Sequence, residues 1–408
     1  MTRIRDLVIT PVAFRDPPLL NSTGLHEPLA LRCVLQLHVD GGIVGLGECP
    51  GDRGQLDRLA AVREHVIGHS VHAINRIERA VERTLAGVAD PIARRATFSA
   101  IEVACLDAQG HLAGVPVAEL LGGAVRPAVP YAAYLFYKWA AHPGADEDEW
   151  GPATTPEGLV EQARRMIDRY GFRSVKLKGG VFEPDEEIAA IMALRAALPG
   201  VPLRLDPNGA WTAETARRVA KELDGTLEYL EDPVLGMDDM AAVAATAPMP
   251  LASNMCTTSL ETIAPVVERG AVQVVLSDHH YWGGLRRTQH LATVCDTFGL
   301  GLSMHSNSHL GISLAAMTHV AATIPTLTYA CDTHYPWNAA DDVVLPGALR
   351  FAEGAVPVPD GPGLGVRLDH DALARLHEAY VRSGRQVRDD AGYLRRFQPG
   401  FDPSLPRW

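Results

Sequence analysis

Six charged or polar side chains recur at similar intervals in the second half of the sequence, each at the end of a short apolar run. They are Lys176, Asp206, Glu231, Asn254, Asp278 and His305, and successive members lie 23 to 30 residues apart. One strand, one helix and two short loops need about that length. We therefore expect a repeated strand–helix unit that places one functional group at the C-terminal end of each strand.

Three successive members of this series offer oxygen atoms, which are the ligands that Mg²⁺ prefers. Asp206, Glu231 and Asn254 end neighbouring predicted strands, so their side chains should converge on one point. Asp206 alone could be a turn residue, because Pro-Asn-Gly follows it. The joint spacing favours a metal site, and in the run Glu231-Asp232-Pro233 we expect only Glu231 to face it.

Lys176 and Lys178 are two residues apart on one predicted strand, so both side chains point to the same face. At the mouth of a barrel they would bind an anion, and each would lower the proton affinity of the other. A lysine of this kind can act as a base. Solvent-facing lysines on an edge strand are the alternative, which the apolar neighbours Val175 and Leu177 argue against.

Asp278 and His305 end the next two predicted strands and form a candidate acid–base pair. A neighbouring carboxylate can accept the Nδ1–H of an imidazole, which fixes the tautomer and raises the basicity of the ring. The chain has 16 histidines, so a single histidine is weak evidence. The local competitors are His279, His280 and His309. We favour His305 because it directly follows the apolar run 300–304.

Alternating strand and helix patterns surround these residues and predict a barrel. Strands are expected near 129 and at 174–178, 202–206, 228–231, 250–254, 272–278, 300–305 and 327–332, with helices over 157–170, 185–198 and 213–223. Parallel strands joined by helices in this number form a closed (β/α) barrel, whose chemistry lies at the C-terminal ends of the strands. We therefore interpret residues 129–354 as the catalytic domain.

Both ends of the chain lack this alternation. Residues 1–50 are typical of β structure around an Asp40-Gly41-Gly42 turn, and helical patterns follow over 55–122. Strands followed by helices predict a separate α+β domain over 1–128. The tail over 355–408 contains one predicted helix, 371–383, and we expect this tail to return to the first domain.

Composition limits the partners of the protein. The 408 residues have a net charge of −12, which argues against nucleic acid and anionic membrane surfaces. Six cysteines without CxxC spacing, together with the lack of an apolar segment of about 18 residues, favour a cytoplasmic protein with reduced thiols. We expect a small-molecule substrate and a homo-oligomer.

Several short runs are more specific than any single residue. They are Leu-Leu-Asn-Ser-Thr-Gly-Leu-His (19–26), Lys-Leu-Lys-Gly-Gly-Val (176–181), Leu-Asp-Pro-Asn-Gly-Ala-Trp (205–211), His-Ser-Asn-Ser-His (305–309), Asp-Thr-His (332–334) and Arg-Asp-Asp-Ala (388–391). Over nearly the whole chain, the sequence resembles the glucarate dehydratase family, in the mandelate racemase-like branch of the enolase superfamily. A neutral third metal ligand, here Asn254, is a mark of that branch.

The resemblance implies a modified (β/α)7β TIM-like barrel, one bound Mg²⁺, and an N-terminal α+β capping domain that the C-terminal tail completes. Lys178 and His305 would be bases on opposite faces of the substrate, with Asp278 orienting His305 and with Lys176 and Asn307 assisting. The metal ligands would be Asp206, Glu231 and Asn254. The residues that match family positions near the substrate are His26, Tyr134, Lys176, Asn208, Asn254, Ser306, Asn307, His334 and Arg388.

The implied reaction is the dehydration of an acid sugar, D-glucarate or L-idarate, to 5-dehydro-4-deoxy-D-glucarate. One departure is the capping-domain loop from Ala86 to Arg95, which is shorter than in the family and offers no counterpart for a substrate-contacting threonine. The alternatives are an epimerase, or a dehydratase for another acid sugar. More distant alternatives are a Schiff-base aldolase, which needs a desolvated lysine without a metal cage, and a non-catalytic binding barrel.

Overall fold

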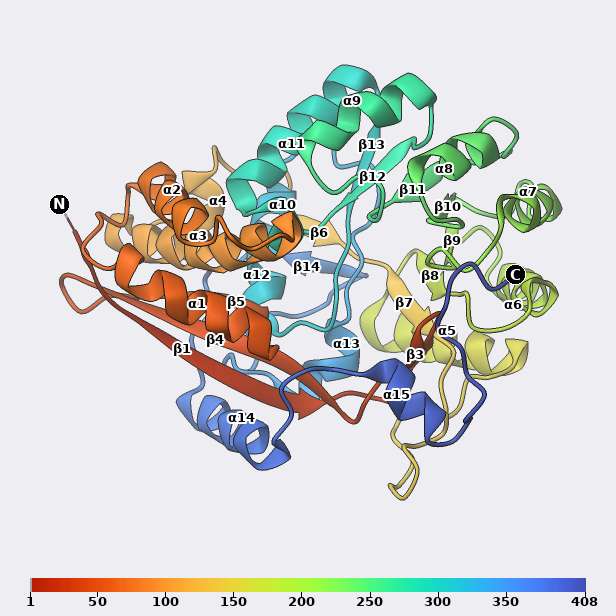
Figure 1. The fold of residues 1–408 in the computed structure, drawn as a ribbon, viewed down its shortest axis with the longest axis horizontal. Helices are drawn as coiled ribbons and strands as arrows, with labels where there is room; N and C mark the ends of the chain where they lie inside the picture. The colour runs from red at the N-terminus through yellow and green to blue at the C-terminus, as the bar shows by residue number, and fades with distance from the viewer. Residues whose placement is uncertain (1) are drawn as a thin grey trace.

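The computed structural model describes residues 2–408 and contains a curled sheet of seven parallel strands (Figure 1). The strands are neighbours in chain order. Their bounds are β7 Ala133–Phe136, β8 Val175–Lys178, β9 Leu203–Asp206, β10 Tyr229–Glu231, β11 Leu251–Ser253, β12 Val274–Ser277 and β13 Gly301–Met304. Helices connect them, so the architecture is the expected TIM-like barrel, with all strand ends at one rim.

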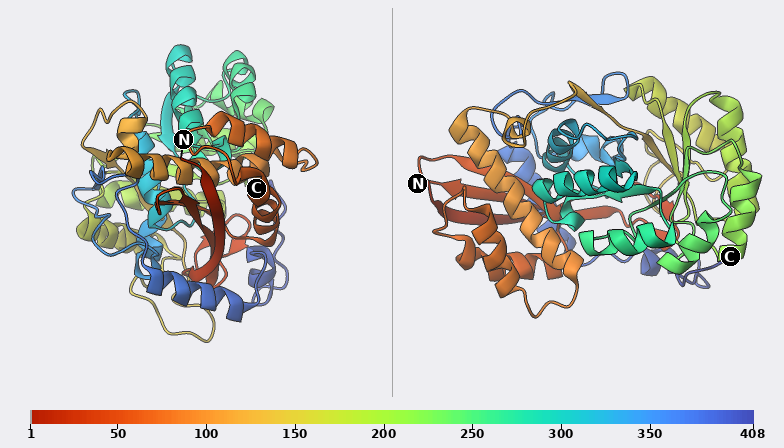
Figure 2. Two further views of the ribbon diagram at one scale, coloured as in Figure 1. Left: turned by 90° about the vertical axis from the view of Figure 1, so that its left-hand side faces the viewer. Right: turned by 90° about the horizontal axis from the view of Figure 1, so that it is seen from above.

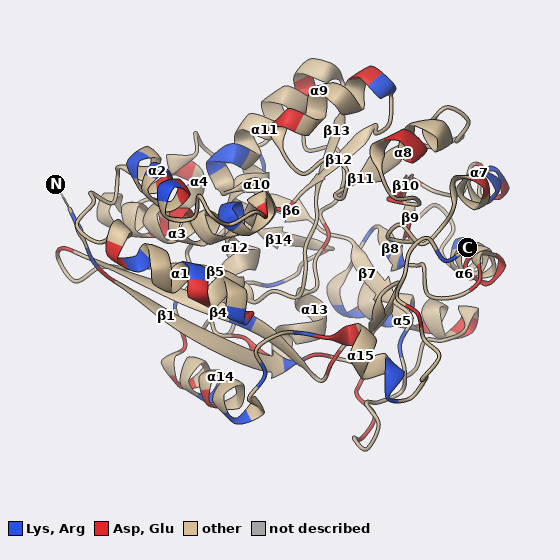
Figure 3. Cartoon of the chain, viewed as in Figure 1, with Lys and Arg blue, Asp and Glu red and all other residues tan. Residues whose placement is uncertain are grey.

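Helices cover the outside of this sheet, as two further views show (Figure 2). They are α5 Pro156–Tyr170, α6 Pro184–Ala197, α7 Ala213–Glu222, α8 Met237–Ala244, α9 Leu260–Arg269, α10 His279–Trp282 and α11 Leu285–Phe298. Local sequence sets their limits. In α5 the Thr155 side chain accepts the N–H of Gly158, and Gly171 ends the helix with a φ of 73°. Figure 3 shows acidic and basic residues interspersed on outer helices such as α7.

Residues 327–332, which we expected to form a strand, do not form one. The segment nevertheless occupies the eighth place in the barrel. The N–H groups of Thr328 and Tyr329 both donate to Leu302 O, and the Leu302 N–H donates to the Thr328 hydroxyl instead of a carbonyl. A regular ladder does not form on that pattern. Cys331 still forms a parallel bridge to the segment before β7, so the ring of elements closes.

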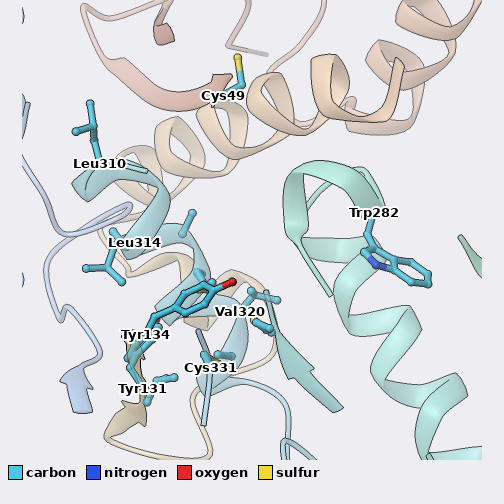
Figure 4. Packing of buried hydrophobic residues seen from close by; sticks show 14 of the residues in the cluster. Cys49, Tyr131, Tyr134, Trp282, Leu310, Leu314, Val320 and Cys331 are labelled. Carbon is cyan, nitrogen blue, oxygen red and sulfur yellow. The ribbon is translucent and has the colours of Figure 1, made fainter. Parts of the chain in front are cut away.

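Helix α12, Gly311–Ala322, lies between the barrel and the N-terminal part of the chain. All of its residues are buried, as expected for a helix that is largely apolar on every side. Figure 4 shows Leu314 and Val320 of this helix close to Tyr131 and Cys331. The helix therefore fastens the barrel to the capping structure.

The N-terminal part is an antiparallel sheet covered by helices. Its strands lie in the order β1 (Ile4–Arg15), β4 (Leu29–Val39) and β5 (Val44–Pro50), and β2 (Leu20–Asn21) pairs with β3 (Gly24–Leu25). The helices are α1 Arg53–Val66, α2 Ile74–Thr84, α3 Pro91–Ala113 and α4 Val117–Leu120. Strands followed by helices form the expected α+β cap.

The C-terminal segment returns to this cap. After α13 (Tyr335–Asn338), strand β14 (Ala355–Pro357) pairs with β6 (Ala128–Pro130), which precedes β7. Helix α14 (His370–Ser383) packs on β1, and α15 (Asp390–Arg395) packs on β3. The domain limits at 128/129 and 354/355 stay predictions.

Among the helices of residues 2–408, none combines the length and the apolar character that a bilayer crossing requires. The cytoplasmic location and the homo-oligomeric state stay predictions from the sequence.

Glycine in β5 lets α3 approach the sheet closely. A β-carbon at Gly45 would lie 2.0 Å from the Ala104 carbonyl oxygen of α3. We predict that Gly45→Ala lowers the free energy of unfolding by roughly 3 kcal/mol in urea denaturation, because the backbone must shift. The control is Gly87→Ala, whose added carbon meets no atom within 4 Å. Equal losses in the two variants would contradict the packing argument.

Candidate active site

A cavity of about 440 Å³ opens where the barrel strands end, and residues of the barrel, the cap and the tail line it. The predicted site residues in its wall are His26, Tyr134, Lys178, Asn208, Asn254, His305, Asn307, His334 and Arg388. The remaining predicted residues are buried and do not line the cavity. They are Lys176, Asp206, Glu231, Asp278 and Ser306.

Lys176 is completely buried among three carboxylates. Its Nζ lies 2.6 Å from Glu231 Oε2, 2.7 Å from Asp332 Oδ2 and 3.3 Å from Asp206 Oδ2. Burial alone would lower the pKa of Lys176, but Asp332 and Glu231 hold it well above its usual value. The net effect of its neighbours on Lys176 is therefore a raised proton affinity, and Lys176 is a fixed cation.

Lys178 reaches the cavity at the end of β8. Its Nζ donates hydrogen bonds to Asp206 Oδ2 at 2.7 Å and to Asn208 Oδ1 at 2.8 Å. Asn208 has a φ of 55°, a left-handed conformation that asparagine tolerates in turns, and its Nδ2 donates to Ser22 Oγ. The turn after β9 thus holds the amine of Lys178 at the cavity wall.

The predicted metal ligands are at the ends of β9, β10 and β11. Burial raises the pKa of Glu231 well above its usual value, and repulsion from Asp206 adds to the effect. Burial would also raise the pKa of Asp206, but Lys178 and Lys176 hold it well below its usual value. Within residues 2–408, no hydrogen bond of regular geometry reaches either carboxylate oxygen of Glu231. Glu231 Oε2 forms the ion pair with Lys176, whereas Oε1 has no partner among the described residues. Oε1, with the oxygens of Asp206 and Asn254, fits an oxygen-preferring divalent cation such as Mg²⁺.

Asp232, the second acid in the run Glu231-Asp232-Pro233, accepts hydrogen bonds from the end of the next strand, β11. Its Oδ1 accepts a hydrogen bond from Ser253 Oγ at 2.5 Å, and its Oδ2 accepts the N–H of Asn254 at 2.9 Å. Burial raises the pKa of Asp232 to about 7, although these donors oppose the shift. Asp232 therefore fixes the backbone from which the Asn254 side chain joins the cavity wall.

The predicted acid–base pair lies at the ends of β12 and β13. His305 Nδ1 is 3.5 Å from Asp278 Oδ2, which is longer than a regular hydrogen bond. The other oxygen of Asp278 accepts the His280 N–H at 2.9 Å and lies 2.8 Å from His280 Nδ1. Burial would raise the pKa of Asp278, but the facing histidines hold it well below its usual value. One carboxylate is thus shared between two imidazole rings.

Arg388 is predicted to lie near the substrate, and two of its nitrogen atoms already donate hydrogen bonds to acidic residues of the protein. Its Nε donates to Asp390 Oδ1 at 2.7 Å, and its Nη1 donates to Asp16 Oδ2 at 3.0 Å. His26 Nδ1 lies 3.2 Å from the same Asp16 carboxylate. These acids orient the guanidinium of Arg388, which lines the cavity, and no hydrogen bond of its Nη2 group is found within residues 2–408.

The residues after β13 differ in how directly they reach the cavity. Ser306 is buried, and its Oγ accepts the His334 N–H at 3.1 Å, so it positions His334 from behind the wall. The His334 ring meets the Tyr134 ring edge-on at 4.7 Å. Asn307 donates from Nδ2 to the Tyr281 hydroxyl at 2.6 Å. A direct substrate contact predicted for Ser306, or for Lys176, is therefore not supported by this arrangement.

Two residues of the site were missed in the sequence. Asp332 contacts Lys176 and lies 27 residues after His305, so the spacing of the strand ends could have found it. Tyr281 lines the cavity, and its ring stacks on that of His305 at 6.5 Å. No sequence signal marks Tyr281. The predicted loop 86–95 is a loop only as far as residue 90, because α3 begins at Pro91, and none of these residues lines the cavity.

Two sequence families match the chain in the same order as the cap and the barrel. Residues 5–122 match "Mandelate racemase / muconate lactonizing enzyme, N-terminal domain", and residues 158–372 match "Enolase C-terminal domain-like". Together with the fold and the cluster of acids and lysines, these matches define a member of the enolase superfamily.

Comparison with individual relatives identifies the family within the enolase superfamily. A "Probable glucarate dehydratase" from Streptomyces coelicolor is 52% identical over 99% of this chain and 100% of its own length. An enolase from Thermobispora bispora complexed with magnesium and formate is 58% identical, with a TM-score of 0.98 over 100% of both chains. An enolase from Mycobacterium smegmatis complexed with tartrate is 59% identical, with a TM-score of 0.97 over 100% of this chain and 99% of that chain. The chain belongs to the glucarate dehydratase family and is an enzyme of the hydro-lyase class.

The burial of Lys176 predicts a large loss of stability when its charge is removed. Lys176→Met should lower the free energy of unfolding in metal-free buffer by about 3 to 5 kcal/mol, because buried carboxylates lose their cation. Chemical denaturation measures this loss. The control is Lys221→Met on α7, where the side chain is exposed and a change of about 0.5 kcal/mol or less is expected. A similar small change for Lys176→Met would contradict its role as a fixed counterion.

Proposed function

We propose that the protein catalyses the Mg²⁺-dependent dehydration of D-glucarate, or of its epimer L-idarate, to 5-dehydro-4-deoxy-D-glucarate. The family assignment supports an acid-sugar dehydratase. The observation that carries the proposal is that two candidate bases, Lys178 and His305, line one cavity from well-separated strands of the sheet. Acidic residues suited to a metal lie at the strand ends between them.

Proton removal beside a carboxylate is the difficult step, because it adds a second negative charge to an anion. Positive charge that is already fixed in place stabilises this charge as it develops. Lys176 supplies such a charge from beneath the cavity wall, held by Asp332 and Glu231. Mg²⁺ bound by Asp206, Glu231 and Asn254 would supply Lewis-acid stabilisation of the same end of the substrate.

The two bases have different tasks in this proposal. Lys178 removes the α-proton of one epimer, and His305 removes the α-proton of the other from the opposite face. The electron pair released at the α-carbon then expels the β-hydroxyl, which takes a proton from His305 and leaves as water. His305 has just removed that proton from one epimer, and for the epimer deprotonated by Lys178 it starts as the imidazolium. The resulting enol tautomerises to the ketone. Both epimers therefore give one product in one cavity.

A dicarboxylate substrate is supported by the far side of the cavity. Arg388 lines the cavity there, oriented by hydrogen bonds of its Nε to Asp390 and of its Nη1 to Asp16. The Mycobacterium smegmatis relative was solved with tartrate, which is a hydroxylated dicarboxylate. We propose that the distal carboxylate of the substrate binds beside Arg388 and His26.

An epimerase is the second candidate, because two bases facing one cavity could also remove and return a proton without losing water. A dehydratase for a different acid sugar would need the same bases. The deciding measurement is incubation of a panel of acid sugars with Mg²⁺, followed by detection of the 2-keto product and of epimerised substrate.

Metal removal is the first test of the proposed reaction. EDTA should abolish formation of the 2-keto product, and excess Mg²⁺ should restore it. EDTA already saturated with Mg²⁺ is the control and should leave turnover unchanged. Full activity of metal-free enzyme would remove Asp206, Glu231 and Asn254 from the proposed role.

The two-base assignment is tested by solvent deuterium exchange at the α-carbon of each epimer. His305→Asn should reduce exchange at the proton facing His305 by at least about a hundredfold and should retain exchange at the proton facing Lys178. Lys178→Ala should show the opposite selectivity. If both variants lose exchange equally at both protons, the assignment of one base to each face is wrong.

A further inference from the structure

The carboxylate that faces His305 is held mainly by a different histidine. His280 contacts Asp278 Oδ1 through its backbone N–H at 2.9 Å and its ring Nδ1 at 2.8 Å, whereas His305 is 3.5 Å from Oδ2. Both rings and the carboxylate are buried. His280 therefore determines how Asp278 is oriented, and with it which oxygen is presented to His305.

The contacts of His280 place a hydrogen on its Nδ1. Asp278 Oδ1 already accepts the His280 backbone N–H, and a carboxylate oxygen only accepts hydrogen bonds. Nδ1 of His280, which lies 2.8 Å from the same oxygen, must therefore carry a hydrogen. Nε2 lies 3.2 Å from Arg32 Nη2, which only donates, and 3.1 Å from the Glu48 backbone carbonyl oxygen, which only accepts. The cap therefore offers Nε2 both a donor and an acceptor.

Two partners of Nε2 come from the cap, namely Arg32 Nη2 and the Glu48 backbone carbonyl oxygen. Arg32 is on β4, and its Nε donates to Glu48 Oε1 of β5 at 2.8 Å. The same Glu48 carboxylate accepts the N–H groups of Leu310 and Ser313 at the start of α12. This buried Arg32–Glu48 pair is fixed on both sides, so it is a rigid support for His280.

Other charged or titratable groups also surround His280. They are His279, whose ring centroid is 4.0 Å away, Ser313, whose Oγ is 3.1 Å from Nε2, and, more remotely, His305, His309 and Glu48. No hydrogen bond from the His279 ring to Asp278 is found within residues 2–408. The direct chain of contacts from the cap to the candidate base is thus Arg32, His280, Asp278 and His305.

We infer that His280 is a positioning residue for the Asp278–His305 pair, and that Arg32 and Glu48 of the capping sheet hold the far side of the His280 ring in place. This inference rests on the proposed role of His305 as a base. On this inference the cap does more than enclose the substrate. Through His280 it also sets the orientation of the Asp278 carboxylate at the end of β12. The hydrogen bonds of Lys178 go to Asp206 and Asn208, outside this chain of residues, so only proton exchange at the His305 face should depend on it.

The test compares proton exchange at the two faces in the Mg²⁺-loaded, full-length enzyme. His280→Leu should slow deuterium exchange at the proton facing His305 by about tenfold or more, a typical effect of removing a hydrogen-bonding partner behind a functional group. Exchange at the proton facing Lys178 should stay within about twofold. His280→Asn, whose amide can donate to Asp278 in place of Nδ1–H, should recover most of the loss. A merely structural role would lower both exchange rates together.

His279→Leu is the matched control, because it removes a buried imidazole one residue away and should leave the ratio of the two exchange rates unchanged. Arg32→Lys keeps a charge beside Glu48 and should lower exchange selectively at the His305 face. Equal losses at both faces in His280→Leu, or no recovery in His280→Asn, would overturn the inference.

A second measurement is independent of catalysis. Nitrogen-15 NMR of histidine-labelled protein, assigned with His280→Asn, should show a hydrogen on Nδ1 of His280 in the wild type and a changed Nε2 signal of that ring in Arg32→Lys. An Nδ1 without hydrogen in the wild type would overturn the inference even if the dehydration is confirmed. A hydrogen on Nδ1 together with no exchange at either face would instead overturn the proposed function.

Discussion

The buried ammonium group of Lys176 is the interaction on which the catalytic end of the barrel depends. It joins acids from β9, β10 and the segment that follows β13, so four neighbouring elements meet at one charge. Without that cation, each acid would be a charge in a water-poor interior, which is strongly unfavourable. The proposed metal ligands thus keep their positions because a permanent cation lies among them. The same charge is available to a substrate carboxylate.

A second constraint comes from helix α12. In a regular barrel this helix would face solvent, but here it is buried between the barrel and the cap, and its first turn is bound by Glu48 of β5. The cap is therefore an integral part of the barrel wall. His305 precedes α12 directly, so the candidate base and the cap are connected through a short, well-packed stretch of chain.

Much of this architecture could be predicted, because strand ends and helix starts carry local signals. The series from Lys176 to His305 predicted six functional strand ends, and the helix limits agree with the patterns of capping residues and glycines. The regular strand–helix alternation predicts a strand at 327–332, and only the irregular bonding to Leu302 shows otherwise. Shared contacts, such as those of Asp278 with two histidines, depend on tertiary geometry and leave no pattern in the sequence.

The salt bridge between Asp16 and Arg388 joins residues 372 positions apart. A contact of such high sequence separation forms late, because almost the whole chain must be ordered before its two ends can meet. Ribosomal synthesis runs from the N-terminus, so the barrel strands emerge and can pair well before Arg388 is made. A nascent chain would therefore hold the acids and lysines of the barrel in place while one wall of the cavity is still missing. Acquisition of substrate binding is, on this view, the final event in the maturation of the enzyme and is separate in time from the folding of its catalytic core.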